Sequence, residues 1–470
     1  MNNFKINTPP PPVAQDKIKI ILLIAAIALI NLLFVFTHEC WRDEAQAWLI
    51  ARDNNLSSLL NVTSYEGHPV LWFLILMPFA KLGLPYFTLK LISYFIILLA
   101  LFIIAFKSPF NLVAKFLFIF NPAFIYCYVT PARSYCLCAL FIIMLAWLYR
   151  TREEQPILYG VILALTLQTH VIMAGFVFCL CVERALSFLK FKNFKKFIGL
   201  CLPFASALFL LFEFRNSSSV ITNHKISFIK FFIEGAANSF RLLNLMALPC
   251  LILFIYLIIK RVNLKPILIF CAAIAWQIFI SAFIYPAGNY RLNSWLFLLI
   301  WLVWVSYDLI NFKNLKILIL LLYLVNVGAW AQNINTMYID LRVNYSNAQD
   351  AAKVIEDLPK DAVIFENAED YCNAIIPYLK DKIIYNPFSK SAASYMDRNP
   401  ALRHSMSYKD FILTCREMFP GINKIFILKS IDINCITGLE ENIQGQKKIY
   451  SSGRPMVING EGFEIYEINL

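Results

Sequence analysis

Residues 17–48 read KIKIILLIAAIALINLLFVFTHECWRDEAQAW, an apolar run that ends abruptly in a group of charged side chains. The apolar part, residues 18–36, is long enough to cross a bilayer, which takes about 20 such residues. We expect it to stay in the membrane as an anchor rather than to be removed as a signal peptide. Asp43 and Glu44 follow soon after it, and polar groups kept at a membrane face usually bind or react with something.

The remainder of the chain has the same apolar character. Of the 470 residues, 59% are hydrophobic and 15% are charged, whereas soluble domains average about 25% charged residues. The apolar runs stop near residue 333. We therefore predict a polytopic α-helical membrane protein with three parts: a disordered cytoplasmic tail at 1–17, a transmembrane domain at 18–334 and an extracytoplasmic α/β domain at 335–470.

The net charge of +12 does not indicate nucleic-acid binding. The basic residues lie mainly between apolar runs, which is typical of cytoplasmic loops under the positive-inside rule. The sequence has no glycine-rich phosphate loop and no Cys/His metal spacing. We therefore predict no cofactor, and the sequence gives no support to a divalent metal. Cys372, Cys415 and Cys435 share the C-terminal domain, where one disulfide is conceivable in an oxidising compartment.

About eleven transmembrane helices are predicted, and two linked alternatives stay open. If residues 69–84 lie flat on the membrane, 157–184 must turn back near 168–170 as a hairpin. If 69–84 cross, 157–184 cross once. Both alternatives place the loop 37–68 outside, together with the C-terminal domain. The spans of the hairpin version are 18–36, 86–106, 112–129, 133–149, 157–168, 170–184, 197–212, 242–259, 266–284, 292–309 and 315–333.

The C-terminal domain has the alternation of an α/β fold. Short β-branched and aromatic runs predict strands at 362–365, 382–385 and 424–428. Helical spacing predicts one helix at 371–379, between the first and second strands, and another at 409–418, between the second and third. No strand carries a nucleotide-binding loop at its end.

A helix is predicted to begin at Arg42 in the first outer loop. Its spacing puts Trp41, Trp48 and Leu49 on one stripe and Asp43 roughly opposite. The tryptophans suit the headgroup region, so this helix would hold a carboxylate at the membrane surface. Asp43 is then either a general base or an acid that simply favours the helix start through the dipole.

Three motifs carry a resemblance to a known family: WRDEAQAW at 41–48, EGHPVLW at 66–72 and ARSY at 132–135. In order and spacing they resemble the GT-C superfamily of integral membrane glycosyltransferases, in particular the branch of protein O-mannosyltransferases and lipid A aminoarabinose transferases. The likeness covers about residues 18–185. It implies transfer of a sugar from a polyprenyl-phosphate donor to an extracytoplasmic glycolipid, polysaccharide or protein, at the outer face of a bacterial inner membrane.

The resemblance also implies roles for single residues. Asp43 would be the catalytic base and Glu44 would support it. Arginines at helix ends suit a phosphate through paired donors, although they can also simply snorkel to the interface. His170 is either a substrate contact or a cap of the hairpin, and Glu66 is the best second carboxylate. The substrate-binding residues predicted in this way are Arg42, Glu66, His68, Arg133, Tyr135, His170, Tyr290 and Arg291.

The sequence departs from the family pattern at two places. Metal-dependent relatives have an acid near the end of the third span, whereas this chain has Thr130-Pro-Ala-Arg133 there. A single Pro69 stands where relatives have paired prolines. Two other functions stay open. A transporter or flippase would need charges inside the spans and paired repeats with broken helices. A non-catalytic subunit of a cell-envelope glycan assembly would keep the fold alone.

Overall fold

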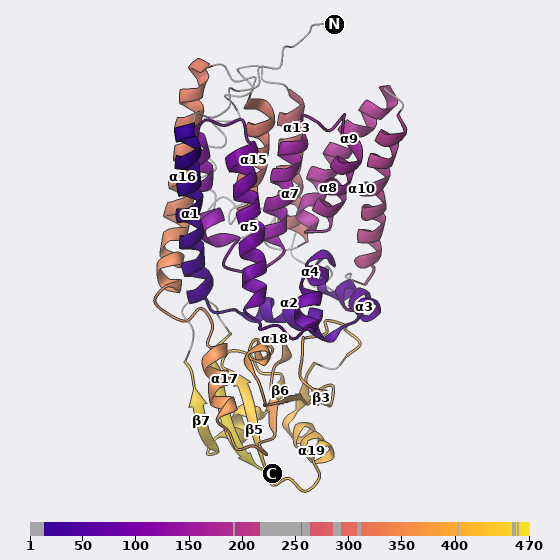
Figure 1. Cartoon of the computed structure of the whole chain (residues 1–470). Coiled ribbons are helices and arrows are strands. Elements are labelled where there is room, and N and C mark those ends of the chain that lie inside the picture. Colours follow the sequence, from indigo (N-terminus) through magenta and orange to yellow (C-terminus); the bar gives the residue numbers. More distant parts are fainter. Residues whose placement is uncertain are drawn as a thin grey trace. The chain divides into compact units, whose positions relative to one another are not determined.

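The chain forms two compact units. Unit 1 comprises Met1–Phe36 and Lys90–Asn335, and unit 2 comprises Thr37–Leu89 and Thr336–Leu470. The predicted outer loop therefore belongs to the same unit as the C-terminal domain (Figure 1). The structure, a computed structural model, describes residues 14–190, 193–216, 255, 264–284, 293–307, 312–402, 404–453, 457 and 460–470.

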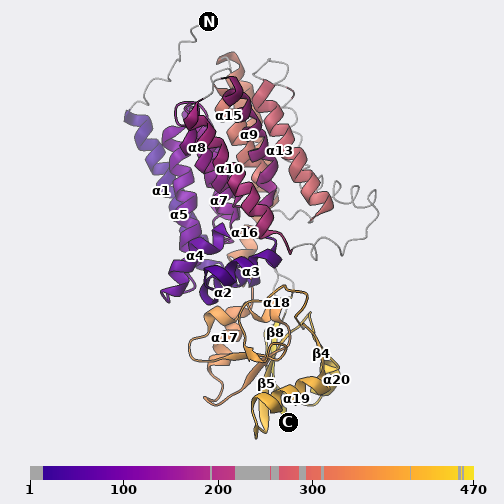
Figure 2. The same ribbon diagram turned by 90° about the vertical axis from the view of Figure 1, so that its right-hand side faces the viewer.

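Unit 1 is helical, and several of its helices run side by side in both views (Figures 1 and 2). Six helices of the described chain are long and apolar enough to cross a bilayer. The elements are α1 (Ala14–Thr37), α5 (Thr88–Lys107), α6 (Leu112–Ile119), the π-helical turn η1 (Ala123–Cys127), α7 (Tyr135–Leu148), α8 (Pro156–Leu167), the short η2 (Val171–Met173), α9 (Ala174–Lys190), α10 (Phe194–Glu213), α13 (Leu264–Phe283), α15 (Ser294–Ser306) and α16 (Phe312–Asp340).

The predicted span 112–129 is not one continuous helix, so that prediction is wrong. Helix α6 ends at Ile119, and the chain continues through the turn η1. The break is tolerated because Asn326 of α16 replaces the lost backbone hydrogen bonds. Its amide donates to the backbone carbonyls of Leu117 at 3.2 Å and Phe120 at 2.9 Å, and its oxygen accepts from the Asn121 side-chain amide at 3.0 Å. The predicted span 242–259 lies outside the described residues except for residue 255.

The break in the segment 157–184 fits the hairpin alternative. That segment is divided into two helices, α8 and α9, which are separated by residues 168–170 and η2. Helix length does not distinguish the two alternatives. Helix α4 (Leu71–Lys81) has 11 residues and α8 has 12, so they rise about 16 Å and about 18 Å, and both are shorter than a hydrocarbon core about 30 Å thick.

The basic residues of unit 1 agree with that choice. The hairpin alternative puts Lys107, Lys115 and Arg150 on the same side of the membrane as Lys17. These four residues line one cavity, at the end of unit 1 where α1 begins and α5 and α7 end. The single-crossing alternative would place Lys17 on the side opposite to the other three.

Two glycines allow the hairpin helix α8 to pack directly on α10. A Cβ atom at Gly160 would lie 2.1 Å from the carbonyl oxygen of Gly199, and one at Gly199 would lie 2.2 Å from that of Pro156. Only glycine fits such an approach of two backbones, which is a common device between membrane helices.

Unit 2 is built on a six-stranded mixed sheet with the order β3-β2-β1-β5-β8-β7. Strand β1 is parallel to β2 and β5, and β8 is antiparallel to β5 and β7. The strands are β1 (Ile364–Glu366), β2 (Ile384–Asn386), β3 (Ser391–Ala392), β5 (Lys424–Ser430), β7 (Lys447–Ser451) and β8 (Phe463–Asn469), with β4 (Met406–Ser407) and β6 (Ile436–Thr437) forming a separate pair.

Two hydrophobic cores cover the two faces of this sheet. On β5, Phe426 and Leu428 face one core and Ile425 and Ile427 face the other. The first core also contains Leu49 of α2, so the predicted outer-loop helix is part of the folded unit. The helices of unit 2 are α2 (Arg42–Asp53), α3 (Leu56–Glu66), α4, α17 (Ala348–Glu356), α18 (Glu369–Cys372), the short η4 (Ile376–Tyr378), α19 (Tyr408–Met418) and α20 (Leu439–Ile443).

Candidate functional site

Helix α2 holds the predicted catalytic pair. Ala45, Trp48 and Leu49 are buried, as the predicted stripe requires, and they fix the helix in unit 2. Asp43 lies in the first turn and is only half-buried, whereas Glu44 beside it is completely buried. The two adjacent acids therefore have different surroundings.

Glu44 is held by two contacts inside unit 2. Its carboxylate accepts the backbone N–H of Trp41 at 3.1 Å, which caps the start of α2. The same oxygen lies 3.5 Å from Nε2 of His38. On the other side of that ring, Nδ1 lies 2.9 Å from a carboxylate oxygen of Asp340. These contacts hold the Glu44 carboxylate inside unit 2, away from solvent.

His38 is the charged centre of this group. Burial by itself would lower the pKa of its imidazole, but the carboxylates of Asp340 and Glu44 outweigh that effect and raise the pKa to about 9. A protonated His38 therefore lies between two carboxylates at neutral pH. All three side chains are at most 1% exposed.

Arg42 and Arg398 share a carboxylate near the start of α2. The guanidinium of Arg42 donates to Asp370 at 2.8 Å and lies 4.2 Å from the ring centre of Tyr371. Arg398 donates to the other oxygen of Asp370 at 3.2 Å. Both arginines remain partly exposed, at 24% and 37%. The Nε atom of Arg42 also lies 3.9 Å from a carboxylate oxygen of Asp43.

Glu66 is the second acid of the site, and it is bound to α2. Its side chain is only 5% exposed and lies 3.6 Å from Arg398. It accepts a hydrogen bond from the Gln46 amide at 2.7 Å. Burial raises the pKa of Glu66 to about 7 against the effect of Arg398, and the Asp43 carboxylate adds to the rise.

Glu461 approaches α2 from the end of the chain. It accepts the backbone N–H of Arg42 at 3.0 Å and is completely buried. Burial raises its pKa to about 8, and the Asp43 carboxylate contributes to that rise too. Asp43 thus lies within electrostatic reach of two carboxyl groups that keep their protons near neutral pH.

Three predicted substrate contacts belong to unit 1. The hydroxyl of Tyr135 lies 3.5 Å from Nε2 of His170, and the two rings stack with centres 5.2 Å apart. Nδ1 of His170 accepts the N–H of Ile172 at 3.2 Å, so this histidine caps η2. The guanidinium of Arg133 lies 5.6 Å from the ring centre of Tyr135.

The other predicted contacts are His68, Tyr290 and Arg291. His68 is half-buried and follows Gly67, whose φ of 70° ends α3 in the left-handed conformation. Tyr290 and Arg291 lie outside the described residues. In the described part of the chain no group of three or more His, Cys, Asp or Glu residues is arranged to hold a metal. Cys372, Cys415 and Cys435 are free thiols, so the conceivable disulfide does not form.

Sequence reasoning missed several residues of this site. Gln46 is the clearest case: its amide oxygen accepts from Asn373 at 2.8 Å and from the N–H of Met396 at 2.9 Å. It therefore joins α2 to residues of the C-terminal part of unit 2, and its place beside the predicted stripe gave no signal of this. Asp340, Asp370, Arg398 and Glu461 are far from the motifs in sequence, and no local pattern singled them out.

The elevated pKa values predict how stability depends on pH. The folded state holds protons on Glu39 to about pH 7, on Glu66 to about 7, on Glu461 to about 8 and on His38 to about 9. The ordinary values are 4.5 for the glutamates and 6.5 for the histidine. The unfolded chain thus binds fewer protons within this window, so stability falls as pH rises.

We expect the thermal unfolding midpoint of the purified protein in detergent to decrease steadily between about pH 5 and about pH 9. Scanning calorimetry at pH 5, 7 and 9 measures it. Glu66→Gln should flatten the decrease between pH 5 and 7, whereas the control Glu417→Gln, at a side chain 65% exposed, should not. A midpoint that rises with pH would contradict the retained protons on Glu39, Glu66, Glu461 and His38 in the folded state.

Comparisons with known proteins show which solved structures share the fold of this chain. No protein-family model matches the chain, and no curated protein matches it. Two solved structures of ArnT from Cupriavidus metallidurans do. The one bound to undecaprenyl phosphate has a TM-score of 0.56 at 8% identity and covers 96% of this chain and 98% of that chain. The apo structure has a TM-score of 0.52 at 9% identity and covers 95% and 97%. The chain therefore shares the fold of these ArnT structures, which supports the predicted polytopic membrane protein.

Proposed function

We propose that this protein is a glycosyltransferase that moves a sugar from a polyprenyl-phosphate donor to an extracytoplasmic acceptor. The observation that carries the proposal is the fold shared over 96% of the chain with an ArnT structure that is bound to undecaprenyl phosphate. The motifs at 41–48 and 66–72 add support, because the structure places Asp43 and Glu66 in one electrostatic group.

The reaction would use Asp43 as the general base. A hydroxyl or amine of the acceptor attacks the anomeric carbon of the sugar, and Asp43 takes the proton that the acceptor loses. The bond from that carbon to the phosphate oxygen breaks, and its electron pair leaves with the polyprenyl phosphate. Attack from the side opposite to the leaving group inverts the anomeric centre.

Cations are needed where the leaving phosphate gathers charge. In unit 2, Arg42 and Arg398 fit this need, because both are partly exposed and each already binds one oxygen of the Asp370 carboxylate. A phosphate presents oxygens in a similar arrangement and would compete with Asp370 for them. In unit 1, Arg133 has the same chemistry beside Tyr135. Glu44 would act through His38 and the start of α2.

The positive-inside rule supports an extracytoplasmic site. The cations at the beginning of α1 indicate the cytoplasmic side, and α1 is 24 residues long. A helix of that length crosses the bilayer once, so residues 37–68 would emerge on the outer face. The acceptor is a glycolipid, a polysaccharide or a protein, as the resemblance implies, and the membrane is the inner membrane of a bacterium.

The test is a transfer assay on the full-length protein in detergent. Undecaprenyl phosphate carrying isotope-labelled hexoses, pentoses and aminosugars is incubated with the protein and a cell-envelope fraction. Mass spectrometry then follows the release of undecaprenyl phosphate and the labelled product. We expect release that depends on the acceptor fraction. Binding of the lipid donors without release from any of them would instead support a non-catalytic subunit of a glycan assembly.

A further inference from the structure

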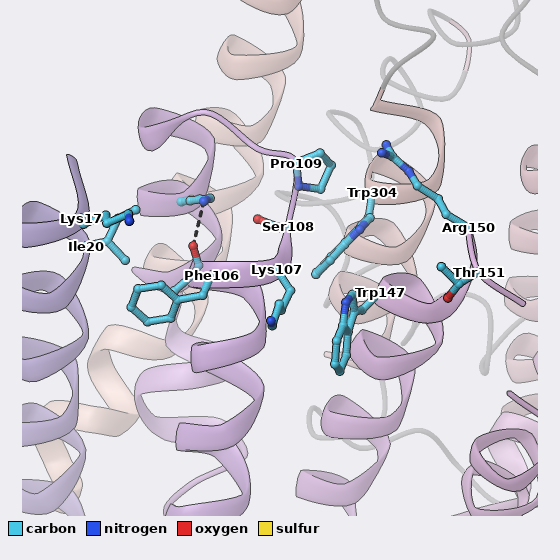
Figure 3. A pocket seen from close by; sticks show the side chains of 12 residues that line it. Lys17, Ile20, Phe106, Lys107, Ser108, Pro109, Trp147, Arg150, Thr151 and Trp304 are labelled. Carbon is cyan, nitrogen blue, oxygen red and sulfur yellow. Dashed lines mark hydrogen bonds between the residues drawn. The ribbon is translucent and has the colours of Figure 1, made fainter. Parts of the chain in front are cut away.

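Unit 1 contains a cavity of about 370 Å³ that the proposed transfer reaction does not use. Its volume is in the range of small-molecule sites. Residues from α1, α5, α6, α7 and α15 converge on it (Figure 3). Its lining consists of Lys17, Ile20, Ala105, Phe106, Lys107, Ser108, Pro109, Lys115, Trp147, Arg150, Thr151 and Trp304.

The lining is strongly cationic. It includes Lys17, Lys107, Lys115 and Arg150, and no carboxylate is among the described residues that line it. Asp16 lies close enough for its charge to act on Lys115, but it also pairs with Lys19 at 3.9 Å. One carboxylate against four cations leaves a positive cavity.

Two acids near the cavity pair with other basic residues, and Glu154, in the loop after α7, does not line the cavity. Glu153 pairs with Arg184 and with Lys196, the latter at 2.5 Å. Glu183 on α9 binds Arg152 at 2.9 Å. These carboxylates therefore neutralise other basic residues and do not offset the charge of the cavity.

The lining also offers hydrogen bonds and flat apolar surface. Ser108 is only 8% exposed, and its hydroxyl has no hydrogen-bond partner in the described chain. Lys107 is exposed, and its ammonium lies 5.5 Å from the ring centre of Trp147. Lys115 donates to the Ala105 carbonyl at 2.7 Å, which fixes its position at the wall. Trp304 and Phe106 give the cavity an apolar rim.

A simpler explanation accounts for part of this arrangement. Cations are favourable at the C-terminal ends of α5 and α7 because of the helix dipole, and they are expected on the cytoplasmic side. Both effects are satisfied by separate, solvated side chains. Neither explains why cations from four segments face one recess that also contains the buried Ser108 hydroxyl and two tryptophans.

We propose that this cavity binds a phosphate-bearing anion, which is either the headgroup of an anionic phospholipid or a soluble phosphate compound. Lys107 and Arg150 are exposed cations of the lining, as is Lys17, and they would bind the anion together with Ser108, which would donate its hydroxyl hydrogen. Basic recesses between helices on the cytoplasmic side are suited to anionic headgroups. The cavity lies at the C-terminal end of α7, whereas Arg133 and His170 lie at its other end, so it is separate from the proposed transfer site.

The test compares the wild type with the double variant Lys107→Gln/Arg150→Gln. The control is Lys190→Gln/Lys195→Gln, which removes the same charge from exposed positions at the end of α9 and the start of α10. Native mass spectrometry of the full-length protein measures retention of phosphatidylglycerol against phosphatidylcholine. Equilibrium dialysis measures binding of radiolabelled inorganic pyrophosphate.

We expect the cavity variant to bind the preferred probe about 30-fold more weakly, because each of the two lost cations contributes about tenfold or slightly less to the binding of an anion. The control should stay within about twofold of the wild type. Retention of phosphatidylglycerol alone identifies a lipid headgroup, and binding of pyrophosphate identifies a soluble ligand. Equal losses in the cavity variant and the control, or no preference for either anion in the wild type, would overturn the proposal. An unchanged unfolding midpoint shows that the variant is folded. Sugar transfer is measured separately and does not depend on this outcome.

Discussion

Replacing Asp43 with asparagine is expected to lower the rate of sugar transfer by about 10²- to 10⁴-fold, the usual contribution of a positioned general base. The asparagine side chain has the same size but cannot take the acceptor proton. Because Asp43 is half-buried in the first turn of a helix that Trp48 and Leu49 anchor, the variant should fold. We expect the turnover rate to fall and the affinity for the donor to change little.

The control for this variant is Asp350→Asn. Asp350 lies in the first turn of α17 in the same unit, its side chain is 45% exposed, and it pairs with Lys353 at 2.8 Å. It should transfer sugar at the wild-type rate. A second readout separates chemistry from structure: Asp43→Glu should restore part of the rate, with a shifted pH profile. Equal transfer by the wild type and Asp43→Asn would remove Asp43 from the mechanism.

The sequence was sufficient to predict the parts of the fold that depend on local patterns. Apolar runs predicted the membrane helices, and the stripe of Trp48 and Leu49 predicted α2. The strand patterns at 362–365, 382–385 and 424–428 correspond to β1, β2 and β5. Strand β8 was missed because FEIYEIN does not alternate strictly, and its buried residues lie on both faces of the sheet. The predicted helix 371–379 is divided between α18 and η4. Pro377 lies in that second turn, and proline removes a backbone donor there.

The composition of the site was beyond the reach of sequence patterns. The residues that surround Asp43 come from two segments, Thr37–Leu89 and Thr336–Leu470, and only the tertiary fold of unit 2 joins them. Asp370 is recognisable only through its two arginine partners, and Glu461 only through its burial beside the Arg42 backbone. Contacts of this kind form only when the unit folds, so they could not be predicted from the sequence, whereas the motif WRDEAQAW can be recognised in the sequence alone.

The buried group around His38 gives the largest expected effect on stability. His38→Leu removes the cation and leaves the carboxylates of Glu44 and Asp340 buried without it. Removing one partner of a buried charged group costs about 3–5 kcal/mol of folding free energy. We expect unit 2 to unfold at a markedly lower denaturant concentration or temperature, measured by circular dichroism on the full-length protein at pH 7, where wild-type His38 is protonated.

The same substitution at His404 is the matched control. His404 also pairs with a glutamate at 2.9 Å, Glu369, but its side chain is 29% exposed, whereas that of His38 is completely buried. Because exposed pairs contribute little, His404→Leu should cost about 1 kcal/mol or less. Adding Glu44→Gln and Asp340→Asn to His38→Leu removes both unpaired charges, and it should recover part of the lost stability. Equal costs for the two histidine variants would show that His38 acts by packing rather than by its charge.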